Sequence, residues 1–150
     1  MCMNETKIFM TKENVRVQKV SKVVLRNRIN KLVNDYKTDG NYKSMIMAAI
    51  LKAYYVVLGG KQGIILYNID KDFVAVCKQA FARLQERAHS SATHLEYGRL
   101  TRDEIIYLTR YINGYYFEMS SKKETLFMNR STVAEAVQAL FIGGKQDEHV

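Results

Sequence analysis

The chain contains no proline, only 8 glycines and only 2 cysteines in 150 residues. Because the turns of all-β proteins rely on glycine and proline, their scarcity argues against a loop-rich all-β fold and favours a helical one. The two cysteines, Cys2 and Cys77, exclude a disulfide framework and indicate a reducing compartment. The apolar fraction of 47% excludes disorder over most of the chain, since it offers enough surface to offset the entropy of ordering.

Long apolar runs are also missing. The longest, residues 45–58, is too short to span a bilayer and contains Lys52. The first residues show no basic segment followed by an apolar run, so we expect no secretory signal. The sequence therefore predicts a cytoplasmic protein without a membrane partner.

Positive charge is concentrated near the N-terminus. The net charge is +8, and the sequence pI is near 9.5. Residues 1–43 carry ten Lys/Arg against four Asp/Glu, whereas residues 44–150 carry thirteen against eleven. Three quarters of the net charge thus lies in the first 43 residues, which is typical of a protein with an anionic partner.

Hydrophobic spacing predicts a mainly α fold with one short strand. Polar and apolar residues alternate over 14–20, which indicates a strand. Helical spacing follows over 22–36 and 42–58, separated by a turn at 39–41. Further helices are predicted over 73–84, 101–115 and 133–141, and the second of these begins with a capping box. The apolar run 64–69 is a candidate strand.

The order of basic strand, amphipathic helix, tight turn and buried helix over residues 14–58 resembles the ribbon-helix-helix DNA-binding family. In that family the strands of two chains pair antiparallel, and the two-stranded ribbon enters the major groove. The period of two along a strand points Asn14, Arg16 and Gln18 outward, while the valines between them face the core. Arginine can bind guanine bidentately, and asparagine or glutamine can bind adenine. These three residues are therefore the expected base contacts.

The resemblance also implies contacts to phosphate. The family's phosphate clamp at the start of the second helix falls on Asn41, Tyr42 and Lys43, where free backbone N–H groups and the helix dipole favour an anion. The family often has Gly-x-Ser or Arg-Ser before that helix, whereas this chain has Gly40-Asn41-Tyr42. Further phosphate contacts are expected from three lysines around the strand, Lys12, Lys19 and Lys22.

We expect residues 12–60 to form the DNA-binding region, 61–144 a helical region for interaction or oligomerisation, and 1–11 and 145–150 flexible termini. The segment VLGGKQ at 57–62 is similar to FIGGKQ at 141–146. Two interpretations follow: residues 61–144 contain a degenerate second repeat, or two helix pairs are similar by chance. The strand has no sequence-adjacent partner, and helix 42–58 is apolar on many sides. A homodimer or larger assembly is therefore expected, unless the second half of the chain covers the first.

Other kinds of site find little support, and no catalytic residue, metal or cofactor is expected. His89, His94 and Glu96 match no zinc spacing. The glycine-rich segment 59–63 lacks the Gly-Lys-Ser/Thr ending of a phosphate loop. The tyrosines at 107, 111, 115 and 116 favour a core or subunit interface over a platform for base stacking.

The sequence therefore predicts a non-enzymatic, homodimeric, sequence-specific double-stranded-DNA-binding transcriptional regulator. Its size and composition suit a regulator or conjugation accessory protein of a plasmid or phage. The alternatives are a helical protein-binding module that uses the tyrosine-rich C-terminal half, and an RNA-binding protein.

Overall fold

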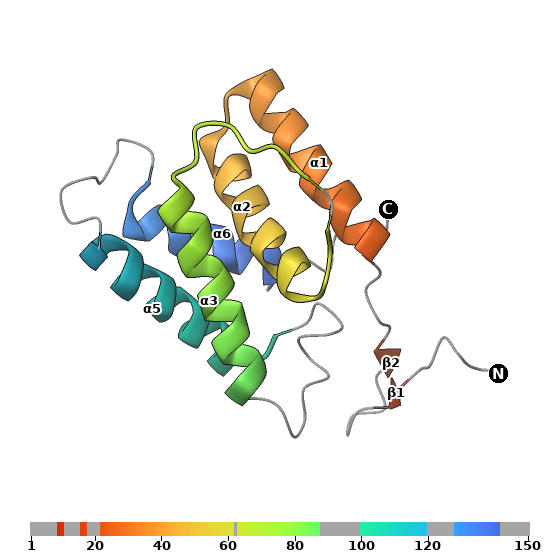
Figure 1. Cartoon of the computed structure of the whole chain (residues 1–150), viewed down its shortest axis with the longest axis vertical. Coiled ribbons are helices and arrows are strands. Elements are labelled where there is room, and N and C mark those ends of the chain that lie inside the picture. The colour runs from red at the N-terminus through yellow and green to blue at the C-terminus, as the bar shows by residue number, and fades with distance from the viewer. Residues whose placement is uncertain are drawn as a thin grey trace.

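α-Helices make up most of the residues that the computed structural model describes, which are 9–10, 16–17, 22–61, 63–87, 100–119 and 128–141 (Figure 1). The predicted mainly α character is confirmed. The helices within these ranges are α1 (Lys22–Asp39), α2 (Tyr42–Val57), α3 (Lys71–Arg87), α5 (Arg102–Met119) and α6 (Arg130–Phe141).

The central helix is α2, which packs against α1, α3 and α6 (Figure 1). Because α5 in turn packs against α3 and α6, four helices close a ring of pairwise contacts, and α1 lies outside this ring on α2. The helix with the most neighbours also has the most buried residues. Ten residues of α2 are buried, whereas in α1 only Leu25 and Ile29 are.

Aromatic rings join the helices of the ring. The Tyr54 ring of α2 lies 5.1 Å from Phe81 of α3 and 6.3 Å from Phe141 of α6, measured between centroids. Phe73 of α3 meets Tyr116 of α5 edge to face at 5.3 Å. Such side chains bury large areas and favour these geometries. One continuous core therefore runs through both predicted regions, 12–60 and 61–144.

Polar caps begin α2 and α5, the second at the capping box that the sequence predicted. The Oδ1 atom of Asn41 accepts a hydrogen bond from the Lys43 N–H at 3.1 Å, at the start of α2. At α5 the capping box is confirmed, since Thr101 Oγ1 accepts from the Glu104 N–H at 3.2 Å and Glu104 Oε1 accepts from the Thr101 N–H at 2.8 Å. Each bond satisfies a backbone donor that has no partner within the helix.

The connection from α2 to α3 is held by specific contacts rather than by a strand. Gly60 lies so close to Tyr55 that a Cβ there would be 2.4 Å from the ring. Asn68 donates from Nδ2 to the Tyr36 hydroxyl of α1, and its carbonyl accepts from the Tyr42 hydroxyl of α2. Residues 64–69 have no regular secondary structure, so the candidate strand there is not formed.

The predicted ribbon-helix-helix class is wrong. Two strands of only two residues, β1 (Phe9–Met10) and β2 (Arg16–Val17), pair antiparallel within one chain, with Phe9 opposite Val17 and Met10 opposite Arg16. The preceding segment of the same chain thus takes the position expected for a second chain. The rest of the predicted strand, 14–15 and 18–20, lies outside the described residues.

Coverage of α2 supplies the second physical reason for this correction. The sequence predicted that a second chain would cover the apolar surface of helix 42–58. Here α3 and α6 of the same chain pack on α2 and bury residues on most of its sides. The second half therefore covers the first, which is the exception that the sequence had left open.

Candidate nucleic-acid interface

The base contacts expected from the sequence fall largely outside the described residues. Asn14 and Gln18 lie there, as do the lysines at 12 and 19, and Arg16 is placed by its backbone alone, in β2. Their roles stay predictions.

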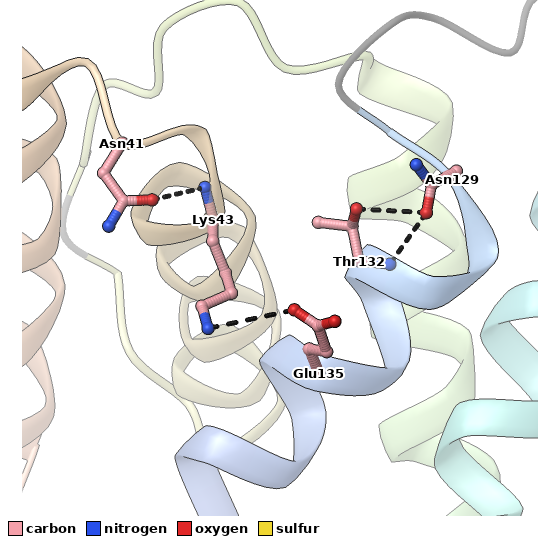
Figure 2. A network of polar contacts seen from close by, with 5 residues as sticks. All are labelled: Asn41, Lys43, Asn129, Thr132 and Glu135. Carbon is pink, nitrogen blue, oxygen red and sulfur yellow. Dashed lines mark hydrogen bonds and ion pairs between the residues drawn. The ribbon is translucent and has the colours of Figure 1, made fainter.

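The expected phosphate clamp is placed at the start of α2, next to α6 (Figure 2). Asn41 caps the helix with its own side chain and so occupies the Lys43 N–H that a phosphate would use. The Tyr42 hydroxyl donates to the Asn68 carbonyl, and burial, followed by the charges of Tyr36 and Asp70, raises the pKa of Tyr42. Two of the clamp's expected donors thus already have partners within the fold.

Lys43 extends toward α6 (Figure 2), where its Nζ lies 4.0 Å from Glu135 Oε1. Both side chains are well exposed, so this pair adds little stability. Asn129 caps α6 in the same way as Asn41 caps α2, accepting from the Thr132 N–H at 2.9 Å.

Lys22 lies at the other end of the α1–α2 hairpin. It is the first residue of α1, and its Nζ would be 3.4 Å from a Cβ on Gly59, just beyond the end of α2. That position favours a cation, because the C-terminal end of a helix carries partial negative charge. An 18-residue helix is about 27 Å long, so the structure separates Lys22 from the clamp residues instead of bringing them together.

The outer face of α1 carries a row of asparagines that sequence reasoning missed. Asn27, Asn30 and Asn34 are all exposed, and their spacing of three and four residues places them on one face, away from the buried Leu25 and Ile29. We call these three residues the asparagine row. Asparagine is a poor helix former, and none of the three side chains makes a hydrogen bond within the described residues. The row therefore serves neither the helix nor the core.

Basic residues flank the asparagine row along α1. The helix has five basic and two acidic residues. Lys31 pairs with Asp35 at 3.6 Å, and Lys37 lies over the Tyr67 ring at 5.2 Å from its centroid. The basic residues of α1 are Lys22, Arg26, Arg28, Lys31 and Lys37.

A second surface lies between α3 and α5, where tyrosines line an open groove of about 680 Å³. Tyr111 stacks on Tyr115 at 4.4 Å between ring centroids. Tyr115 is 53% exposed and Ile106 43%, whereas Tyr116 is fully buried. We call this the tyrosine groove. The tyrosines of α5 thus divide between core and surface, and sequence spacing alone did not separate them.

No group of three or more His, Cys, Asp or Glu side chains in the described part of the chain is arranged to hold a metal ion. His89, His94 and Glu96 lie outside that part. None of the described helices combines the length and apolar character needed to cross a bilayer.

No family model, no curated protein and no solved structure matches the chain.

Proposed function

We propose that this chain is a cytoplasmic, sequence-specific double-stranded-DNA-binding regulator rather than an enzyme, and that the outer face of α1 is its contact surface. The observation that carries the proposal is the asparagine row, exposed along a helix whose flanks are basic. Asparagine binds adenine bidentately in the major groove, and lysine and arginine bind phosphates.

The placement of α1 supports this use. The helix packs mainly on α2, outside the ring of the other four (Figure 1), and among the described residues the asparagine row on its outer face is exposed. A helix with its side chains is about 10–12 Å wide, and the major groove is about 12 Å wide. Arg16 and its neighbours Asn14 and Gln18 remain proposed base contacts in addition to the row.

The test is selection from random duplexes, followed by titration of the selected duplex, a scrambled duplex and duplex RNA. A regulator of this kind binds the selected duplex on the order of a thousandfold more tightly than the scrambled one. If the basic side chains of α1 neutralise about four phosphates, log K falls with log salt at a slope of about −4. Absence of duplex binding would refute the proposal, and a preference for RNA would reassign the chain to RNA binding.

Protein binding through the tyrosine groove is the second candidate function. The observation that favours it is the exposure of Tyr115 and Ile106, together with Met119 at 59%. Tyrosine and methionine are enriched at protein interfaces. Since α2 is already covered within the chain, a homodimer would need another surface, and the groove offers one in which tyrosines and Ile106 lie among charged residues.

Sedimentation equilibrium tests this candidate with two charge changes on α5. Tyr115→Lys introduces a charge into the groove, and Glu118→Lys changes an exposed residue of the same helix that does not line it. If the groove joins two copies, only Tyr115→Lys shifts the protein toward a monomer. If the wild-type chain is monomeric, the partner that binds the tyrosine groove is a different protein.

A further inference from the structure

Three lysines surround a cleft of about 270 Å³ between α2, α3 and the connection at 64–69. Lys52 comes from α2, and Lys71 and Lys78 come from one face of α3. The remaining lining is apolar and consists of Leu66, Ile69, Val74 and Ala75. We call this the lysine cleft. It lies apart from the asparagine row, since none of its lining residues belongs to α1.

Lys52 is an unusual residue at its position. It lies in the most buried helix of the chain, and its Nζ donates to the carbonyl of Ile64 at 2.7 Å. That bond holds the ammonium group at the cleft while leaving its other two donor hydrogens for a further partner. Burial, and then the charge of Lys78, lowers the pKa of Lys52.

The cleft concentrates positive charge without compensation by an acidic side chain. Within the described residues, no ion pair joins any of the three lysines to Asp or Glu. The acidic residues on either side of Lys71 do not line the cleft. Asp70 instead caps α3 through the Asp72 N–H at 2.8 Å and lies 3.4 Å from the Tyr116 hydroxyl of α5. Like charges held together cost free energy, and a bound anion would remove that cost.

We propose that the lysine cleft binds a small phosphate monoester, with the phosphate between the three ammonium groups and a short carbon body on the apolar lining. Lysine binds phosphate as a point charge through several hydrogen-bond donors. The apolar lining lies beside the lysines, so it can contact the carbon atoms of a small ester while the phosphate meets the ammonium groups. The proposal does not depend on DNA binding.

The experiment is a titration of the full chain with glycerol 3-phosphate, inorganic phosphate and chloride at matched ionic strength, followed by backbone amide shifts in NMR. The shifts are expected to change around 64–78. Glycerol 3-phosphate should bind more tightly than inorganic phosphate, and chloride should have no saturable effect. The proposal would be overturned if neither phosphate probe caused a localised change in the shifts and any binding had a Kd above about 10 mM.

Variants then separate the cleft from general positive charge. Lys78→Met is expected to weaken glycerol 3-phosphate binding about tenfold, and Lys78→Arg to retain most of it. Lys61→Met removes an exposed lysine that does not line the cleft and should change nothing. Lys52→Met tests the second ammonium group, and Lys78→Met still decides the matter if that variant fails to fold. Equal loss in Lys61→Met and Lys78→Met would refute the site.

The phosphodiester of DNA would present the same kind of phosphate oxygens to the lysine cleft. If Lys78→Met weakens duplex binding while glycerol 3-phosphate does not bind the wild type, the cleft is a nucleic-acid contact and the proposal fails. If Lys78→Met loses the monoester and keeps duplex affinity, the cleft is a small-molecule site. Failure of duplex binding alone contradicts the proposed function and leaves the cleft untouched.

Discussion

Replacing the asparagine row with alanine should raise stability and weaken DNA binding in the same variant. Asn27, Asn30 and Asn34 are exposed on a helix, so each Asn→Ala change removes a poor helix former without removing a packing contact. Each change is worth up to about 0.7 kcal/mol in helix propensity, or about 2 kcal/mol for the three. For a domain of about 150 residues this corresponds to a rise of about 4–8 °C in Tm.

The same triple variant loses whatever base contacts the row makes. A bidentate contact discriminates by about 1–3 kcal/mol. Three lost contacts at the lower end would weaken binding to the selected duplex more than a hundredfold, with a smaller loss on a scrambled duplex. The assay is fluorescence anisotropy on both duplexes beside a thermal melt, with Gln138→Ala, an exposed amide of α6, as the matched control. Because the melt should move upward, unfolding would not explain a loss of affinity.

Two results would refute this reasoning. Unchanged affinity for the selected duplex with a raised Tm would mean that the row does not contact bases. A lowered Tm would mean that the asparagines support the fold, contrary to their exposure.

Three further predictions concern the strand, a turn and a buried tyrosine. Arg16→Ala should cost about 1–3 kcal/mol on the selected duplex with little change in melting temperature, and equal loss on both duplexes would make it a phosphate contact. Gly60→Ala should destabilise the chain by about 2–3 kcal/mol in urea unfolding, because the added Cβ meets the Tyr55 ring, whereas Gly63→Ala, with open space around it, should change little. Burial, then the charge of Asp70, raises the pKa of Tyr116 to about 12 from its ordinary 10.0. As the pH rises, the unfolded state therefore loses this proton before the folded state does. The neutral hydroxyl stabilises the fold fully below pH 10, and the free energy of unfolding should fall between about pH 10 and 12. Unfolding titrations of Tyr116→Phe should show a smaller decrease over the same pH range.

Local signals in the sequence predicted the helices well. The capping box at Thr101 and Glu104 and the cap at Asn41 depend on side chains that bond to backbone within three residues, so they can be recognised without knowing the fold. The turn at Gly40 is equally local, because its φ of +72° favours glycine.

The candidate interface was only partly predictable. The excess charge near the N-terminus is visible in the composition, and α1 carries much of it. The asparagine row was present in the same residues, yet its meaning depends on which face of α1 is buried. The lysine cleft was not predictable, because Lys52 and Lys78 lie on different helices and meet only through the packing of α2 on α3.

The sequence by itself determined the helical class, the ends of several helices and the place of the positive charge, since these follow from composition, spacing and short-range hydrogen bonds. Tertiary structure decided what covers α2. Its apolar surface predicted a neighbour without naming it, because burial of apolar area is not directional and any complementary face satisfies it. The resemblance over residues 14–58 pointed to a second chain, whereas α3 and α6 of the same chain take that place.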